Sequence, residues 1–408
     1  MSAAVVSVER WEALKARALA RVDELSAEII ALADDIHAHP ELGYQERRTV
    51  GLVRDLLARH GIDSEVGVGG LETALRARVG RGDGARVAIL AEYDALPGLG
   101  HACGHNAICM SAVGATLALA ALRDDLPGDA LLLGCPAEES AVDNAGGKIH
   151  LLAAGLFEGV DAAIMVHPND RDDGALHTSL AARGVQFEFR GKPAHAAAAP
   201  HEGINALDAM ILLFQGIGLL RQQARADCRI HGIITHGGDA PNIIPAYTAA
   251  RFRVRAADLA TMQDLYARVV AVAEGAARAT GATLSYRDFA PPYEDQVPNA
   301  ILTEQVRAAF AAVGRPLATE SRGGMGSTDF GNVSRRIPAY CPYVRIADEG
   351  IQPHTVQFAD AARTPAAHAM ILDSAKAMAL TTIELLARPD LLAAAQAEFQ
   401  TRLKGGAR

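Results

Sequence analysis

One short stretch, Ala91–Asn106, constrains this chain more than any other, because it brings two carboxylates, a thiol and two imidazoles into one loop. It reads Ala-Glu-Tyr-Asp-Ala-Leu-Pro-Gly-Leu-Gly-His-Ala-Cys-Gly-His-Asn. The apolar run before it, Ala85–Leu90, predicts a buried strand, and the residues after it predict a helix rich in Ala, Leu and Met. Ligands bind at the carboxyl ends of strands in open α/β sheets. The pattern therefore indicates a ligand site in this loop.

Cys103 and His105 are the most informative pair in that loop. If the segment is extended, residues two apart leave the backbone on the same face. A thiolate and an imidazole together are good ligands for zinc or a similar divalent ion. Gly104 between them removes a side chain where a metal or substrate must come close. Either residue alone is more often ordinary packing, but the pair beside Asp94 favours a metal site.

Composition narrows the class of protein. The 408 residues suggest two domains, or one large domain with an insertion, and half of them are hydrophobic. A net charge of −9 argues against nucleic acid or an anionic membrane as the main partner. Five scattered cysteines do not form a disulfide framework. Met1–Glu24 has no apolar core of signal-peptide type, and no run reaches membrane-spanning length. We therefore expect a cytoplasmic protein.

The first half of the chain alternates strand and helix patterns, which predicts an α/β fold with a mostly parallel sheet covered on both faces. The expected strands are Leu71–Val79, Arg86–Ala91, Ala130–Cys135 and Ala162–Val166. The expected helices are Val8–His37 (one or two), Glu46–His60, Ala107–Leu122 and Gly147–Ala154. Gly61 is expected to cap the C-terminus of the helix Glu46–His60 in a left-handed conformation.

The pattern changes near Leu180 and predicts an inserted domain. The order strand, helix, strand, strand, helix, strand is that of a ferredoxin-like unit. Its expected elements are Gly184–Arg190, Asn205–Gln223, Arg229–Thr235, Thr248–Ala256, Leu259–Ala279 and Ala282–Arg287. We predict that residues 182–290 form this lid or dimerisation domain, and that residues 1–181 and 291–408 form a metal-binding catalytic domain. Asn299–Val313 and Thr364–Ala387 are predicted helices of the latter.

Further polar groups follow other predicted strands. Glu138 and Glu139 come directly after a buried strand, and adjacent residues there point in opposite directions, so one carboxylate can bind metal while the other faces a substrate. A carboxylate near a metal-bound water is the usual general base of metallohydrolases. His167 ends a third apolar run, and His354 lies in a loop before the final helices. Each of these has an ordinary alternative as a solvated turn or capping residue.

Two loops of the inserted domain carry polar groups that could hydrogen-bond a substrate or simply form turns. They are His195 in Gly191–Ala196 and Asn242 in Gly237–Pro245. A nucleotide site is disfavoured. The glycine-rich loop Gly323–Phe330 resembles an anion cradle at a helix N-terminus but lacks the lysine and spacing of a P-loop. Val66–Gly70 is too loose for a dinucleotide fingerprint.

Together these motifs resemble the M20 metallopeptidases, and more closely their amidohydrolase branch, subfamily D. That branch includes N-acyl-amino-acid and auxin-conjugate hydrolases, aminobenzoyl-glutamate hydrolase and β-alanyl-type dipeptidases. The resemblance runs from about residue 28 to residue 387. It rests on segments that occur in family order: Ala91–Asn106, Pro136–Gly147, Met165–Pro168, Gly191–His195, Asn242–Pro245 and Gly326–Gly331. The segments that look most like the β-alanyl dipeptidases are Gly100–Asn106, Asn242–Pro245 and Gly326–Gly331.

The resemblance implies a site with two divalent metal ions per subunit, zinc or manganese, with cobalt or nickel as alternatives. Cys103, His105, Glu139, His167 and His354 match the family's metal ligands, and Cys103 stands where other branches have a bridging aspartate. Glu138 matches the general base, Asp94 the aspartate that orients the site, and His195 the histidine that stabilises the oxyanion, often from a partner subunit. Asn242 and Arg253 match substrate-contacting positions. Asn106 stands where many members have Asp, and Glu92 stands where other branches have a ligand histidine and is left out of the expected ligands.

The implied activity is hydrolysis of an amide in a small substrate, by a metal-activated water that Glu138 deprotonates. A dipeptide or an N-acyl amino acid is the expected substrate, and the alternative is an N-acyl-amino-acid or aminobenzoyl-glutamate amidohydrolase rather than a dipeptidase. A non-catalytic binding protein on the same fold would be expected to lack the base or a ligand. The resemblance also implies a homodimer, or higher homo-oligomer, through the inserted domain.

Overall fold

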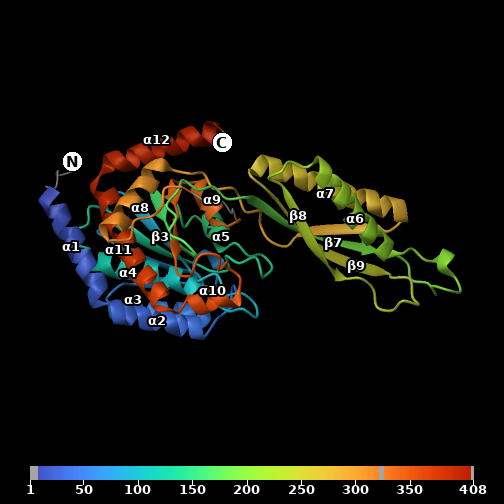
Figure 1. The fold of residues 1–408 in the computed structure, drawn as a ribbon, viewed down its shortest axis with the longest axis horizontal. Helices are drawn as coiled ribbons and strands as arrows, with labels where there is room; N and C mark the ends of the chain where they lie inside the picture. Colours follow the sequence, from blue (N-terminus) through green and yellow to red (C-terminus); the bar gives the residue numbers. More distant parts are fainter. Residues whose placement is uncertain (1–7, 321–325, 406–408) are drawn as a thin grey trace. The chain divides into compact units, whose positions relative to one another are not determined.

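The computed structural model describes residues 8–320 and 326–405, so the first seven residues of the predicted N-terminal segment and the start of the Gly323–Phe330 loop lie outside it. The chain divides into two compact units. Unit 1 comprises Met1–Thr178, Gln296–Gly324 and Asn332–Arg408, and unit 2 comprises Ser179–Asp295 and Met325–Gly331. We describe each unit by itself (Figure 1).

Unit 1 is built on a six-stranded sheet in the order β1-β2-β4-β3-β5-β11. The strands are β1 (Ser64–Val66), β2 (Leu75–Val79), β3 (Arg86–Glu92), β4 (Asp129–Cys135), β5 (Ala162–Ile164) and β11 (Ala339–Tyr340). The last four in this spatial order, β4, β3, β5 and β11, are mutually parallel, whereas β2 pairs antiparallel with β4 and with β1. A second small sheet pairs β6 (His167–Asn169) with β12 (Tyr343–Arg345) in parallel. The prediction of a mostly parallel sheet is confirmed.

Helix α4 (His105–Ala120) lies at the centre of unit 1, because every one of its residues is buried. It packs on β3 and against α11 (Pro365–Ala387), α2 (Ser26–Ala38) and α1 (Val8–Glu24) (Figure 1). Its sequence is apolar all round, which is what a helix enclosed on every side requires. A helix held in this way gives its first residue, His105, a rigid position at the carboxyl ends of the parallel strands.

The other helices of unit 1 are α3, α5, α8, α9, α10 and α12. Their bounds are Arg47–Arg59, Gly147–Ala153, Ala300–Ala312, Phe330–Ser334, Val356–Ala361 and Pro389–Gly405, the first residues of α9 being grouped with unit 2. Helix α3 ends as expected, since Gly61 has a φ of 67°. Side chains at the N-caps of α8, α10 and α11 accept a backbone N–H of the first turn, from Asn299, Thr355 and Thr364.

Unit 2 has the ferredoxin-like topology that the strand and helix order predicts. Its elements are β7 (Ala181–Arg190), α6 (Ala206–Leu220), β8 (Arg229–His236), β9 (Tyr247–Ala256), α7 (Leu259–Thr280) and β10 (Thr283–Asp288). The four strands form an antiparallel sheet in the order β10-β7-β9-β8. Helices α6 and α7 cover one face, where alternate residues of β7 and β9, such as Phe187 and Phe252, are buried. Strand β8 is left as an edge of this sheet.

Within the described residues, no helix is long and apolar enough to cross a membrane. All five cysteines lie in the described part of the chain, and none of them forms a disulfide.

Candidate metal centre

The predicted metal-binding residues converge at the carboxyl ends of the parallel strands. Glu92 ends β3 and Asp94 follows it; Glu138 and Glu139 follow β4; and His167 follows β5. His105 is the first residue of α4, and Cys103 and His354 come from loops. The backbone N–H of His354 donates to the carbonyl of Ala102, so its loop is tied to the one that carries Cys103. Parallel neighbours bring their strand ends to one edge, which is why residues far apart in sequence meet here.

Among the described residues, three groups have ligand atoms close enough to share a cation. They are Cys103–His105–His167, Cys103–Glu139–His354 and Glu92–His105–Glu138, with all ligand atoms of a group within 4.8 Å of one another. All five predicted ligands occur in the first two groups, and both contain Cys103. Glu138 and Glu139 belong to different groups, in agreement with the prediction that the two carboxylates diverge.

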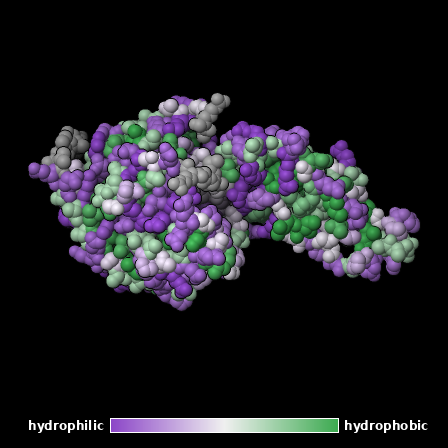
Figure 2. All heavy atoms as spheres, viewed as in Figure 1, coloured by the Kyte–Doolittle hydropathy of each residue, from purple (hydrophilic) through white to green (hydrophobic). Residues whose placement is uncertain are grey.

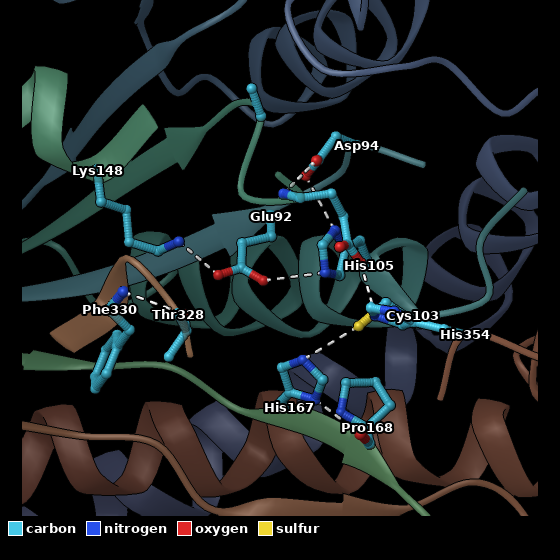
Figure 3. A network of polar contacts seen from close by, with 12 residues as sticks. Glu92, Asp94, Cys103, His105, Lys148, His167, Pro168, Thr328, Phe330 and His354 are labelled. Atoms are coloured by element: carbon cyan, nitrogen blue, oxygen red, sulfur yellow. Dashed lines mark hydrogen bonds and ion pairs between the residues drawn. The ribbon is translucent and has the colours of Figure 1, made fainter. Parts of the chain in front are cut away.

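Asp94 connects three parts of the centre (Figure 3). Its Oδ1 accepts a hydrogen bond from His105 Nδ1 at 3.0 Å, and its Oδ2 accepts one from the backbone N–H of Glu139 at 2.9 Å. Because a carboxylate only accepts, the Nδ1 of His105 carries a proton. Burial lowers the pKa of His105, but the charge of Asp94 raises it well above its usual range. A divalent ion at Nε2 would therefore displace a proton from that atom. Burial alone would raise the pKa of Asp94, but the charge of His105 and the hydrogen bonds lower it, so the carboxylate stays ionised.

The same argument orients His167. Its Nδ1 donates to the carbonyl of Pro168 at 2.8 Å, so Nε2 carries the lone pair, and this atom lies 3.5 Å from Cys103 Sγ. Burial lowers the pKa of His167 and keeps the ring neutral. Burial, and then the charge of Glu139, raise the pKa of the Cys103 thiol well above its usual range. Without a cation Cys103 is therefore a thiol, and binding of a divalent ion would make it a thiolate.

A divalent ion fits these residues. Among the buried polar atoms of the described residues, Glu92 Oε2, His105 Nε2 and Glu139 Oε1 have no hydrogen bond of good geometry. His354 Nε2 lies 3.1 Å from that oxygen of Glu139. Buried polar atoms without a partner are rare in proteins, and these are carboxylate and imidazole atoms that bind zinc or manganese. In the described part of this centre, four buried carboxylates lie near a single buried ammonium, that of Lys148, so there is an excess of negative charge for cations to balance.

The pair Cys103 and His105 meets for a different reason from the one expected. The segment is not extended: Gly104 has a φ of 76° and His105 begins a helix. A turn followed by the first helical residue, rather than the pleat of a strand, brings both side chains into one group. The prediction for Gly104 also needs correction in its detail. A Cβ at this residue would lie 2.8 Å from Pro168 Cγ, so the close neighbour is the proline after His167.

Glu46, which the sequence did not single out, supports the loop that carries Glu138. Its buried carboxyl accepts hydrogen bonds from the N–H of Ala137 at 2.9 Å and from Thr73 Oγ1 at 2.6 Å. Ala137 precedes Glu138 and has a φ of 53°, a left-handed conformation that costs free energy for a residue with a Cβ. Burial, and then the charge of Asp94, raise the pKa of Glu46 to about 7. A glutamate at the start of a predicted helix carries no sequence signal for this role.

Glu92 was left out of the expected ligands, and Lys148 was not singled out at all. Both are fully buried, and Lys148 Nζ lies 2.5 Å from Glu92 Oε1 (Figure 3). Besides the family resemblance, the signal for Glu92 is its spacing of two from Asp94, which places both carboxylates on one face of the strand end. A lysine at the start of α5 looks like a solvated residue in sequence. His101, in contrast, lies in the same loop but in none of the three groups, and burial lowers its pKa to about 3.

The remaining predicted site residues lie in unit 2. His195 is exposed, and its Nδ1 accepts the N–H groups of Ala197 and Ala198 at 3.3 and 3.2 Å. The carbonyl of Asn242 accepts the N–H of Ala196, so the two predicted loops are adjacent. Arg253 lies on β9, with its guanidinium 5.5 Å from the centre of the Phe289 ring.

Comparison with known proteins gives one consistent match. Residues 88–374 match the model of peptidase family M20/M25/M40, a range that includes every candidate metal ligand. The chain is 37% identical to the Xaa-Arg dipeptidase of Mus musculus, over 98% of this chain and 95% of that protein. It is 29% identical to one of the subunits of the p-aminobenzoyl-glutamate hydrolase of Escherichia coli, over 90% of this chain and 91% of that protein.

Solved structures show the same fold. A Bacillus subtilis protein described as a dinuclear metal-binding peptidase of the M20 family aligns with 89% of this chain and 99% of its own, at a TM-score of 0.64 and 22% identity. An aminobenzoyl-glutamate utilization protein of Klebsiella pneumoniae aligns with 89% of this chain and 97% of its own, at a TM-score of 0.71 and 19% identity.

The buried carboxyl of Glu46 gives a testable pH dependence. Its pKa in the folded protein, about 7, lies above the ordinary value of 4.5. The stability it contributes is therefore fully present below about pH 4.5 and is lost as the pH rises through about 7. From about pH 5 to about pH 8, the free energy of unfolding of the metal-free wild type should fall relative to that of Glu46→Gln by about 2–3 kcal/mol.

The measurement is denaturant unfolding of both metal-free proteins at a series of pH values. Glu274→Gln, which removes an exposed carboxylate from α7, is the matched control. Parallel stability profiles for the wild type and Glu46→Gln would contradict the assignment of a raised pKa to Glu46.

Proposed function

This chain belongs to peptidase family M20/M25/M40, and we propose that within this family it is a dipeptidase that uses two divalent metal ions. It is a metallopeptidase or amidohydrolase by family. The observation that carries the proposal is that one thiol, Cys103, is shared by two groups of ligand atoms. A shared ligand is what a pair of neighbouring ions requires.

In this proposal one ion is held by Cys103, His105 and His167, and the other by Cys103, Glu139 and His354. When bound, the ions supply Lewis acidity, which lowers the pKa of a water and polarises the substrate carbonyl. The thiolate and imidazoles suit zinc, and the carboxylate also suits manganese; cobalt and nickel are further candidates. The protein's contribution is the fixed orientation of the ligands: Asp94 holds His105, and the Pro168 carbonyl holds His167.

Glu138 is proposed as the general base. Its carboxylate is buried and lies in the group with Glu92 and His105, and it is a member of neither Cys103 group. It is therefore next to the centre without being needed as a ligand of either proposed ion. Glu138 would take a proton from the attacking water and later give it to the leaving amine. Burial strengthens its electrostatic interactions with a substrate and with the cations.

His195 is proposed to stabilise the oxyanion that forms on the substrate carbonyl. Because its Nδ1 accepts two backbone N–H groups, the neutral ring carries its proton on Nε2 and presents a donor to solvent. A hydrogen-bond donor held in a fixed orientation stabilises the negative charge that develops on the carbonyl oxygen in the transition state. The adjacent loop of Asn242, together with Arg253, is proposed to contact the substrate. In this role unit 2 would act as a lid, closing to bring His195 to the carbonyl.

A homodimer through unit 2 is proposed on the basis of its exposed edge. Strand β8 pairs only on its β9 side among the described strands, and Ile233 and Ile234 on it are 65% and 44% exposed. Figure 2 shows hydrophobic surface over this part of unit 2. Long apolar edge strands invite pairing with another strand, and the same strand of a second copy is the partner of matching chemistry.

The substrate proposed first is a dipeptide with a C-terminal arginine, because two relatives at 37% and 34% identity are named Xaa-Arg dipeptidases. The second candidate is aminobenzoyl-glutamate or an N-acyl amino acid, which the names of more distant relatives favour. We propose the cytoplasm as the location, because a reducing compartment keeps a thiol such as Cys103 available as a ligand.

The first test is metal content together with hydrolysis of a substrate panel. The panel contains Xaa-Arg, β-alanyl and other dipeptides, N-acetyl and N-benzoyl amino acids, and aminobenzoyl-glutamate, each with and without chelator and with added zinc or manganese. We expect two bound ions per chain, cleavage that chelator abolishes, and the fastest cleavage with Xaa-Arg dipeptides. Absence of bound metal under every condition would contradict the proposal.

Glu138→Gln tests the general base. The variant should keep both ions and lose activity by about 10²–10⁴-fold in kcat, because the amide cannot take up the proton. Glu139→Gln is the matched comparison, since it should lower metal content as well as activity. Metal analysis and steady-state kinetics of both variants separate the two roles. Activity of Glu138→Gln within a few-fold of the wild type would show that the base is another residue.

His195→Ala should lower kcat by about 10²–10³-fold with metal content unchanged, because only a transition-state donor is lost. His201→Ala, at another exposed histidine of unit 2, is the control and should keep wild-type kinetics. An unchanged kcat for His195→Ala would remove this residue from the mechanism. Mixing inactive Glu138→Gln and His195→Ala chains then assigns the histidine: activity returns only if His195 serves the site of the partner subunit in a dimer.

A further inference from the structure

His354 is the most exposed of the five candidate ligands, and the loop that carries it has little packing of its own. Its side chain is 53% exposed, whereas Cys103 and Glu139 of the same group are buried. Every residue from 348 to 355 is exposed or half-buried, and Ile351 among them packs against the hydrophobic core. A ligand on such a loop binds an ion well only if further contacts fix the loop, because ordering it on binding costs conformational entropy.

Asp170 supplies fixing contacts shortly before the ligand. It directly follows β6, the strand that His167 begins, and it is 1% exposed. Its Oδ2 accepts a hydrogen bond from the backbone N–H of Gly350 at 2.9 Å and another from Nε2 of Gln352 at 3.3 Å. One buried carboxylate oxygen therefore holds two residues of the loop, the nearer of them two positions before His354.

The hold on Gln352 extends to His354. Pro353 lies between them, and its ring fixes its own φ. The carbonyl of Gln352 accepts a hydrogen bond from Thr355 Oγ1 at 2.8 Å, and that hydroxyl oxygen accepts the N–H of Phe358 at 3.2 Å as the N-cap of α10. His354 thus lies between two anchored residues. Its φ of 66° is a left-handed conformation that a residue with a Cβ keeps only where its surroundings hold it.

The charge of Asp170 makes these contacts strong. Burial alone would raise the pKa of Asp170, but the hydrogen bonds from the side chain of Arg171, at 3.0 Å to Oδ1, and from the N–H of Gly350 lower it. The carboxylate is therefore ionised. Hydrogen bonds to an ionised acceptor are roughly twice as strong as those between neutral groups. A neutral side chain at this position would hold the loop less firmly.

We propose that Asp170 is a positioning residue, which holds His354 within reach of the ion that Cys103 and Glu139 bind. The inference rests on the proposed function, because it needs that ion. Asp170 belongs to none of the three groups of ligand atoms, so it acts through the loop, by limiting the positions open to the imidazole. It also follows His167 by three residues. One side chain therefore ties the segment that carries a ligand of one proposed ion to the loop that carries a ligand of the other.

The test titrates metal-free full-length protein with Zn²⁺ and with Co²⁺, whose visible absorption reports the number and type of ligands. Asp170→Ala should weaken binding of one of the two ions by about 10–100-fold and leave the other unchanged, because only the loop of His354 is released. Asp170→Asn keeps an oxygen that can accept from Gly350 and should restore most of the affinity. Gln352→Ala removes one of the two bonds at an exposed residue and should weaken the same ion by a smaller factor. It replaces Asp170→Ala if that variant fails to fold.

Asp172→Ala is the matched control. Its Oδ1 accepts the N–H of Arg345 and Nε of Arg315, both at 2.9 Å, so this variant loses contacts of the same kind to the segment before the loop. It should lower the free energy of unfolding and keep wild-type affinity for both ions. A second control uses His354→Ala as the background. There Asp170→Ala should have no further effect on metal affinity, because Asp170 acts through His354.

Three results would each overturn the role of Asp170. They are wild-type affinity for both ions in Asp170→Ala, equal weakening in Asp170→Ala and Asp172→Ala, and a further loss of affinity in the His354→Ala background. The wild type separates this failure from that of the proposed function. If it binds two ions while the variants give one of these results, only the role of Asp170 is lost. If it binds none, the metal-dependent function is lost with it.

Discussion

The carboxylate of Asp94 makes the contacts on which the candidate metal centre depends. One of its oxygens accepts from His105 at the start of α4, and the other accepts from the backbone of Glu139 after β4. A single side chain just after β3 thus positions one candidate ligand, His105, and the loop that carries Glu138 and a second candidate ligand, Glu139. Because α4 is buried on every side, His105 cannot move away from Asp94 without disturbing the core of unit 1.

Near Asp94, two residues that are not glycine have left-handed backbone conformations, and hydrogen bonds hold both of them in place. Ala137 and His354 both have positive φ values, of 53° and 66°, and each is tied by a hydrogen bond, to Glu46 and to the Ala102 carbonyl respectively. Such residues cost of order 1–3 kcal/mol each and persist where their surroundings hold them. Ala137 directly precedes Glu138, and His354 is itself a candidate ligand. The hydrogen bonds that hold these two strained residues therefore also orient groups that the proposed chemistry uses.

Much of this site could be predicted from the sequence because parallel strands end at one edge. Once the strands before Glu92, Glu138 and His167 are recognised by their apolar runs, their polar ends must be neighbours. The order of elements in unit 2 likewise follows from hydrophobic periodicity, and the sheet order β10-β7-β9-β8 confirms it. The roles of individual residues came from family resemblance, because spacing alone does not distinguish a ligand from a capping residue.

The buried partners could not be predicted in this way, and the reason is physical. The local hydrophobic pattern predicts which apolar residues face a core. It gives no sign that a charged side chain such as Lys148, Glu46 or Glu92 is buried, because that burial arises only when the tertiary structure forms. The turn at Gly104 is similar: its φ of 76° and its contact with Pro168 come from packing between segments 64 residues apart, counted from Cys103 to His167. Periodicity and strand ends in the chain were enough to predict that the candidate ligands after the parallel strands lie at one edge of the sheet. Which oxygen or nitrogen of each candidate ligand is directed into the centre was decided only by the hydrogen bonds that folding assembles around it.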